Sequence, residues 1–220
     1  MVFGLHPEFA HLFLRPIEPD DRPPYEAEKL RSEEIDLHLG ISYAEETSVP
    51  SRDHETWSHL SPQIFQTPYP ELMRIVDDAD PKQTGKRWVD LGAAYGRLGI
   101  VLAATRRNST FVGMEVLPSR VATAKAIYAR LGLNPDSMTT GNCESDPLPA
   151  GDIYFIYDFG TREAVNSALE KIKTEARSRS ITVIGRGRRV RDLIEREHPW
   201  LGYVVPPLHR DHYSVYHTSL

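Results

Sequence analysis

From residue 86 onward the chain alternates between two kinds of segment, short apolar runs and stretches with apolar residues at helical spacing. Short apolar runs, the pattern of buried strands, occur at Trp88–Gly92, Thr110–Val116, Ser137–Thr140, Asp152–Tyr157 and Ile181–Gly185. Between them lie segments with apolar residues at helical spacing, at Arg97–Arg107, Ser119–Leu131, Arg162–Arg177 and Val190–Glu197. Strands that alternate with helices predict a doubly wound α/β fold built on a mostly parallel sheet.

The C-terminal end has a different pattern. Two further apolar runs, Tyr203–Leu208 and Tyr213–Thr218, are separated only by the polar residues 209–212. A connection this short cannot accommodate a crossover helix, so we expect the two runs to pair as an antiparallel hairpin.

The first 85 residues are less regular. Residues 15–25 are rich in proline and acid and predict irregular backbone, whereas residues 26–39 have the apolar spacing of a short helix. A second helix is expected to start near Pro68, within an ordered stretch at Ser61–Asp78. We therefore predict an N-terminal extension (1–60), a lid helix (61–85) and a Rossmann-like core (86–220). The last two together form one domain, 61–220.

Composition narrows the class of protein. The chain has 220 residues, 40% of them hydrophobic and 26% charged, which is typical of a globular protein. It contains no apolar run long enough to span a membrane and no signal-like N-terminus, so we expect a cytoplasmic protein. The only cysteine, Cys143, excludes an internal disulfide, and the nine histidines lack metal-ligand spacing. No metal is expected.

Charge is distributed unevenly. Residues 1–85 hold 7 Lys and Arg against 17 Asp and Glu, whereas residues 162–220 hold 11 against 7. Four of these basic residues, Arg186, Arg188, Arg189 and Arg191, follow a predicted strand. They suit either a phosphate or acidic substrate, or a solvated turn.

The segment Val89–Arg97, with the sequence VDLGAAYGR, joins a predicted strand to a predicted helix. Its small residues allow close approach of a ligand, and the helix N-terminus offers free amides and a partial positive charge. The carboxylate of Asp90, at the strand end, can accept a hydrogen bond from an ammonium group. S-adenosylmethionine carries both an ammonium and a carboxylate, so this turn suits its methionine half.

The segment resembles the D-x-G-x-G-x-G pattern of the class I, seven-strand methyltransferases. Asp90, Gly92 and Gly96 match, and Ala94 replaces the middle glycine, with Ala93 and Tyr95 between them. The resemblance implies S-adenosyl-L-methionine as cofactor and the seven-strand order of that fold. A dinucleotide-binding register (Ala94–Gly99) remains as an alternative, but it would set Asp90 close to a diphosphate that it repels. A third interpretation is that Asp90 only caps the helix.

Further cofactor contacts are expected after the next two strands. Glu115 ends the second strand, where a carboxylate can accept from both ribose hydroxyls, although a surface glutamate would fit as well. Gly141-Asn142-Cys143 follows the third strand. The resemblance implies an Asp there that meets the adenine amino group; Asn142 replaces it, and Cys143 would offer a backbone contact or simple packing.

The loop after the fourth strand is the candidate catalytic segment. It reads Tyr157-Asp158-Phe159 and lacks the prolines of the N-P-P-Y motif. A polar residue before Phe resembles the seven-strand, non-SET protein-lysine methyltransferases, which implies that Tyr157 or Asp158 orients the nucleophile or accepts its proton. The alternative is that Asp158 only caps the following helix.

A weaker resemblance to the same enzymes lies at Thr67-Pro68. There Thr67 would touch the methionine end of the cofactor, although a Thr-Pro pair also marks an ordinary helix start.

These features predict an S-adenosylmethionine-dependent methyltransferase (class EC 2.1.1) that acts on a protein side-chain amine, on lysine. A small-molecule or nucleic-acid methyltransferase is the alternative, and a non-catalytic cofactor-binding module is a third. A protein substrate is the expected partner, with no membrane association. The sequence does not indicate an oligomeric state.

Overall fold

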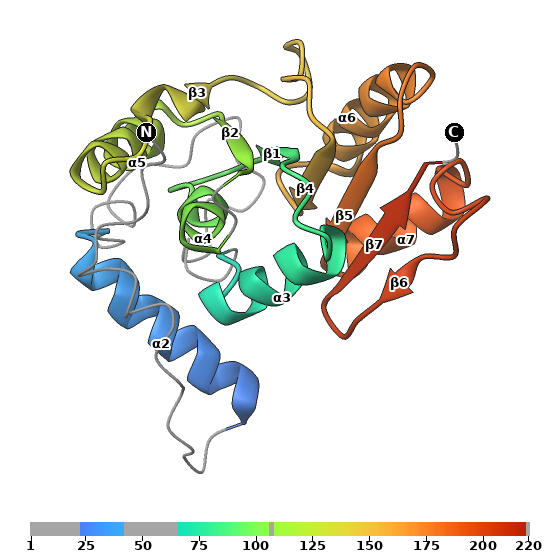
Figure 1. Ribbon diagram of the computed structural model, residues 1–220. Helices are drawn as coiled ribbons and strands as arrows, with labels where there is room; N and C mark the ends of the chain where they lie inside the picture. The colour runs from blue at the N-terminus through green and yellow to red at the C-terminus, as the bar shows by residue number, and fades with distance from the viewer. Residues whose placement is uncertain (1–22, 42–65, 106–107, 219–220) are drawn as a thin grey trace.

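The computed structural model of the chain describes residues 23–41, 66–105 and 108–218 (Figure 1). Most of the Pro- and acid-rich stretch at 15–25 lies outside the described residues, as do residues 42–65, which include the start of the stretch expected to be ordered at Ser61–Asp78. The described part contains a seven-stranded sheet with the order β3-β2-β1-β4-β5-β7-β6. The strands are β1 Arg87–Leu91, β2 Thr110–Glu115, β3 Met138–Thr140, β4 Ile153–Tyr157, β5 Thr182–Arg186, β6 Leu208–His209 and β7 Tyr213–His217.

Strand directions confirm the predicted α/β class. Strands β1 to β5 pair in parallel, and β7 pairs antiparallel with both β5 and β6. The chain order reverses between β1 and β4, which makes this the topological switch point of the sheet. Open α/β sheets bind their ligands in the crevice beyond the carboxyl ends of the strands at this point.

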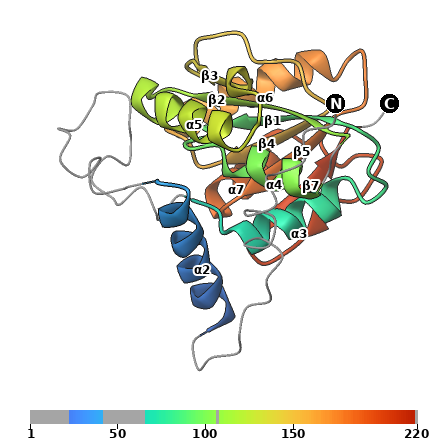
Figure 2. The ribbon, with the colours of Figure 1, turned by 60° about the vertical axis from the view of Figure 1, so that its left-hand side comes forward.

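Helices cover both faces of the sheet (Figures 1 and 2). They are α2 Pro24–His38, α3 Tyr69–Ala79, α4 Arg97–Thr105, α5 Pro118–Arg130, α6 Arg162–Glu175 and α7 Arg188–Glu197, with a 3₁₀ turn, η3, at Pro135–Ser137. Trp88 of β1 packs with α2 to α5 in one core, and its neighbour Val89 packs with α6 and α7 in the other. This alternation follows from strand geometry, because successive side chains point to opposite faces.

The predicted strand at Tyr203–Leu208 is mostly wrong. Residues 203–207 form bends and coil, and only Leu208 and His209 pair with β7. Pro206 and Pro207 lack the backbone N–H that a ladder needs, so pairing begins after them. The apolar run that suggested a strand is partly exposed, with Tyr203 and Val204 facing solvent. The hairpin itself is present, with a much shorter first strand.

The helix expected at 26–39 is α2, which lies against α3 (Figure 2). Ile35 and Leu39 are buried as expected, and Ile41 joins them in the core that contains α3 to α5. Leu37, which we expected among the apolar members, is 71% exposed. The buried side of α2 instead includes two polar residues, Ser32 and Asp36.

The described ranges show neither a membrane-spanning helix nor a cluster of metal-ligating side chains. None of the helices there is long and apolar enough to cross a membrane. Those ranges also contain no group of three or more His, Cys, Asp or Glu side chains placed to hold a metal ion.

Candidate functional site

The turn between β1 and α4 has the conformation that its small residues favour. Gly92, Ala94 and Gly96 all have positive φ, at 80°, 47° and 75°. Ala94 therefore adopts a left-handed conformation at the position where the methyltransferase pattern has glycine, at a cost of about 1–2 kcal/mol for an L-residue. The amides of Gly92 and Ala93 donate to the carbonyl of Met114, which ties the turn to β2.

Asp90 lies at the end of β1 with only 5% of its surface exposed. Its carboxyl group forms no hydrogen bond or ion pair with any of the described residues. Burial, and then the nearby charge of Glu115, raise its pKa to about 8. A buried carboxyl without a partner is costly in a folded protein, so this position is suited to a ligand that donates hydrogen bonds.

Glu115, at the end of β2, has backbone partners instead. Its Oε2 accepts from the amide of Ala94 at 2.8 Å, and its Oε1 accepts from the amide of Leu117 at 3.0 Å. The guanidinium of Arg120 lies 3.8 Å away. Glu115 is buried and fixes the middle of the turn through its bond to the amide of Ala94.

The loop after β4 meets this turn directly. A Cβ built on Gly92 would lie 2.6 Å from the Cβ of Phe159, so the residue at 92 must be glycine for the two loops to approach. The switch point of the sheet therefore brings the candidate cofactor turn and the candidate catalytic loop into contact.

Tyr157 and Asp158 lie at the carboxyl end of β4. The guanidinium of Arg186 stacks over the Tyr157 ring at 4.0 Å. Asp158 has a positive φ of 22°, and burial raises the pKa of its carboxyl group although Arg189 and Arg186 oppose this. The side chain that caps α6 is Thr161, whose hydroxyl accepts from the amide of Ala164. Asp158 therefore does not serve as the helix cap.

Asn142 and Cys143 follow β3, and their loop is held from within. The side-chain oxygen of Asn142 accepts from the amide of Glu144 at 2.9 Å, so one of its lone pairs is already used. Cys143 is buried, and burial raises the pKa of its thiol to about 12, which makes it an inert packing residue. Lys171 donates to three carbonyls of this loop, those of Cys143, Glu144 and Asp146.

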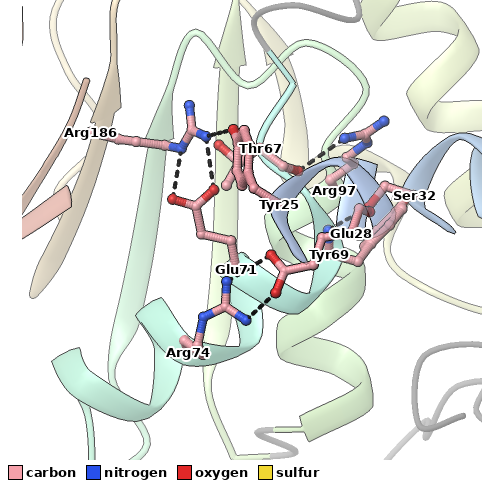
Figure 3. Close-up of polar contacts among 9 residues, drawn as sticks. All are labelled: Tyr25, Glu28, Ser32, Thr67, Tyr69, Glu71, Arg74, Arg97 and Arg186. Carbon is pink, nitrogen blue, oxygen red and sulfur yellow. Dashed lines mark hydrogen bonds and ion pairs between the residues drawn. The ribbon is translucent and has the colours of Figure 1, made fainter. Parts of the chain in front are cut away.

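Two buried ion pairs beside the site were not expected from the sequence, and Figure 3 shows the one between Arg186 and Glu71. Arg97, the first residue of α4, pairs with Asp36 of α2 and donates to the carbonyl of Thr67 at 2.9 Å. Arg186, the last residue of β5, pairs with Glu71 of α3 at 2.8 Å. The partners are far apart in sequence, and no local pattern marks them.

The arginines after β5 do not form a free basic strip. Arg186 is buried against Glu71, and Arg188 and Arg189 lie 3.6 and 3.9 Å from Asp192 and Asp158. Arg191 donates to the carbonyl of Arg210 at 2.7 Å. Neither of the two interpretations offered by the sequence fits Arg186, because it is neither solvated nor free.

Comparison with known proteins finds similar solved structures but no similar sequence or family model. No protein-family model and no curated protein sequence matches the chain. A mutant of MtNAS, solved in complex with S-adenosylmethionine, is similar with a TM-score of 0.53 and 15% identity over 96% of this chain and 87% of that one. A second structure of that mutant has a TM-score of 0.52 and 14% identity, covering 97% of this chain and 81% of that one.

An RNA methyltransferase from Salinibacter ruber, in complex with S-adenosyl-L-homocysteine, covers 70% of this chain and 92% of its own. Its identity is 19% and its TM-score is 0.48. A mostly parallel seven-strand sheet that ends in an antiparallel hairpin is the Rossmann-like fold of the class I methyltransferases, and this chain has that fold.

Proposed function

We propose that this protein is an S-adenosylmethionine-dependent methyltransferase whose cofactor binds at the carboxyl ends of β1 and β2. The observation that carries the proposal is Asp90, a buried carboxyl group without a partner in the described structure, at the switch point of the sheet. The ammonium group of the cofactor supplies the missing donor. Its charge would favour the ionised carboxylate and lower the raised pKa.

Other residues suit the remaining parts of the cofactor. The turn at 92–96 and the start of α4 offer backbone amides to the methionine carboxylate, with Thr67 held nearby through its bond to Arg97. Glu115 is suited to the ribose hydroxyls. Asn142 and Cys143 follow β3 on the side where adenine is expected, although the use of Asn142 by Glu144 leaves it one free lone pair. The similarity to a fold solved with S-adenosylmethionine supports this assignment.

The bound cofactor supplies a sulfonium methyl group, and the protein must present a neutral nucleophile to it. We assign that task to Tyr157 and Asp158. Desolvation raises the pKa of Asp158, which makes its carboxylate a better proton acceptor than an exposed one. A lysine ammonium bound there would give its proton to Asp158, and the neutral amine would then be placed to accept the methyl group that the cofactor would supply.

For the acceptor we propose a side-chain amine of a protein, that of lysine. The partly buried carboxylate of Asp158 attracts an ammonium group. Arg186 is buried against Glu71 and Arg191 donates to a backbone carbonyl, so a phosphate would meet the exposed guanidinium of Arg188 and not a row of four. The excess of acidic residues in 1–85 further favours a basic polypeptide.

Radiolabelled methyl transfer into a cell lysate tests this function. The label is expected in material that resists nuclease and is lost with protease; the reverse pattern would assign the activity to nucleic acid. No labelling, with S-adenosylmethionine still bound, would point to a binding module.

The catalytic assignment is tested with Asp158→Asn, which we expect to lower kcat by about 100-fold or more without changing cofactor affinity. Asp192→Asn, which removes the partner of a neighbouring arginine on α7, is the matched control and should keep full turnover. Tyr157→Phe is the second variant. Full turnover in both Asp158→Asn and Tyr157→Phe would contradict the proposed catalytic roles of these two residues.

A further inference from the structure

We infer that α2, which lies before the expected methyltransferase domain, completes the cofactor site, and that Asp36 is its positioning residue. Asp36 acts through Arg97, the residue that begins α4 and follows the glycine turn directly. The inference rests on the proposed function, because it assigns α2 to the same cofactor site.

The contact between Asp36 and Arg97 is fully enclosed. Asp36 has no exposed surface and Arg97 is 5% exposed. The Nε of Arg97 donates to Oδ1 of Asp36 at 3.2 Å, and its Nη2 donates to Oδ2, so the pair is bidentate. This planar geometry fixes the direction of the guanidinium as well as its distance.

The same two residues hold the segment that leads into α3, and Figure 3 shows the contact of Arg97 with Thr67. The Nη1 of Arg97 donates to the carbonyl of Thr67, and the hydroxyl of Tyr69 donates to Oδ1 of Asp36 at 3.0 Å. One turn earlier in α2, the hydroxyl of Ser32 accepts from the amide of Tyr69 at 2.9 Å. Asp36 therefore joins α2, the 67–69 segment and the start of α4 in one buried network.

Within the described part of the chain, we compare three side-chain anchors of the glycine turn. Glu115 holds the amide of Ala94, and the hydroxyl of Tyr128 donates to the carbonyl of Gly96 at 2.7 Å. The third anchor is the Asp36–Arg97 pair, and it is the only one of the three that comes from α2. Because Ala94 and Gly96 have left-handed backbone conformations, the turn depends on its surroundings to keep its amides in place.

The inference is tested with Asp36→Asn in the full-length chain. This change keeps the shape of the side chain but removes the charge that Arg97 faces. Affinity for S-adenosylmethionine is measured by calorimetry, well below the unfolding temperature of each variant. We expect the Kd to rise about tenfold or more, because small displacements of aligned groups are costly.

Glu28→Gln is the matched control. Glu28 binds Arg74 with two bonds of 2.6 and 2.7 Å across the same α2–α3 interface, and it does not contact Arg97. This variant should keep the wild-type Kd within about twofold even if its Tm falls. A variant that acts only through stability would instead show Kd and Tm changing together in both substitutions.

Removing one partner of a buried pair can unfold a protein, so Tyr69→Phe serves as a milder variant. It deletes a single bond to Asp36, and we expect a rise in Kd of about threefold, the worth of a weak hydrogen bond. Hydrogen exchange without ligand supplies a second measurement. The amides of residues 94–98 should exchange faster in Tyr69→Phe, and in Asp36→Asn if it folds, than in Glu28→Gln.

The outcomes separate the two claims. The role of Asp36 would be overturned if Asp36→Asn had the Kd and the amide hydrogen exchange of the wild type. If Asp36→Asn does not fold, the same result in Tyr69→Phe would overturn it. An equal loss of affinity in Glu28→Gln would overturn it too. If the wild-type protein itself does not bind S-adenosylmethionine, the proposed function fails, and the exchange data still decide whether α2 sets the conformation of the turn.

Discussion

Asp90 and Glu115 are both buried carboxyl groups at the ends of neighbouring parallel strands, but their surroundings differ. Glu115 accepts two backbone amides, whereas Asp90 has no partner in the described part of the chain. A carboxylate that binds backbone amides has a structural role without any ligand. Asp90 lacks such bonds, so we expect the pKa of its carboxyl group to change when the cofactor binds.

The raised pKa of Asp90 predicts an unusual dependence of stability on pH. Its pKa is about 8 in the folded protein and near 3.8 in the unfolded chain, so the folded state binds more protons between these values. This contribution to stability therefore falls as pH rises. Relative to Asp90→Asn, which does not titrate, the wild type should lose up to about 1.4 kcal/mol per pH unit.

Urea unfolding of both proteins without cofactor, at several pH values between about 5 and 7, measures this difference. Parallel pH profiles for the wild type and Asp90→Asn would show that Asp90 is not desolvated and unpaired.

A second prediction concerns Gly92, because Phe159 occupies the space that a Cβ at residue 92 would need. Gly92→Ala should displace the loop after β4 and weaken S-adenosylmethionine binding by at least about tenfold. Gly132→Ala is the control, since Gly132 also has a positive φ, of 69°, but no atoms near its Cβ position. It should lose about 1 kcal/mol of stability and keep its cofactor affinity. Equal affinities in the two variants would contradict the account.

The sequence predicted the acid and the turn at 90–96 because their signal is local. A strand that ends in Asp and continues into small residues constrains its own backbone. It did not predict that Asp36 pairs with Arg97, or Glu71 with Arg186, because the residues of each pair meet only after the sheet and its helices have assembled.

At the scale of elements, α3 is held over the carboxyl end of the sheet by charge as well as by apolar packing. Glu71 in its first turn binds Arg186 at the end of β5, and the same guanidinium donates to the hydroxyl of Tyr25 in α2 and stacks on Tyr157. This arginine thus connects α2, α3, β4 and β5. We expect it to stabilise the fold and to orient the Tyr157 ring.

Glu71→Gln leaves the guanidinium of Arg186 buried beside a neutral partner, and it should destabilise the protein by about 3–5 kcal/mol. Arg74→Gln, on the same helix, breaks a pair whose arginine is half exposed and should cost less than about 1 kcal/mol. Denaturant unfolding compares the two. A similar loss of stability in both variants would show that the buried Glu71–Arg186 pair contributes no more to folding than the exposed one.

Element boundaries were predictable where periodicity and caps agree. Strand β4 lies within one residue of its expected range because it is a continuous apolar run. The expected strand at 203–208 is mostly absent because Pro206 and Pro207 lack the backbone donors that pairing needs, whatever the hydrophobicity of the run. The 3₁₀ turn at 135–137 was not expected, since it rests on one proline and on the side chain of Asn134.

At the scale of the whole molecule, α2 belongs to the same hydrophobic core as α3, α4 and α5. Ile35, Leu39 and Ile41 are buried there, although we predicted that residues 1–60 form an extension to a separate domain at 61–220. The fold class was predictable from the alternation of strands and helices. The attachment of α2 was not, because its few apolar positions do not reveal their partners.

A fragment that contains only residues 61–220 tests that domain boundary. It lacks the three apolar side chains, each worth about 1.5–3 kcal/mol when fully buried, and leaves Arg97 without Asp36. We expect the fragment to unfold at a much lower temperature than the full chain, or not to fold. A fragment with the thermal stability of the full chain would establish residue 61 as the start of an independent domain.

Calorimetry with the wild type and Asp90→Asn at about pH 8 measures whether S-adenosylmethionine binds beside Asp90. We expect one site per chain in the wild type and an affinity about 10- to 100-fold weaker in the variant, the cost of losing one hydrogen bond to a charged group. Absence of binding by the wild type, or equal binding by the two proteins, would contradict it.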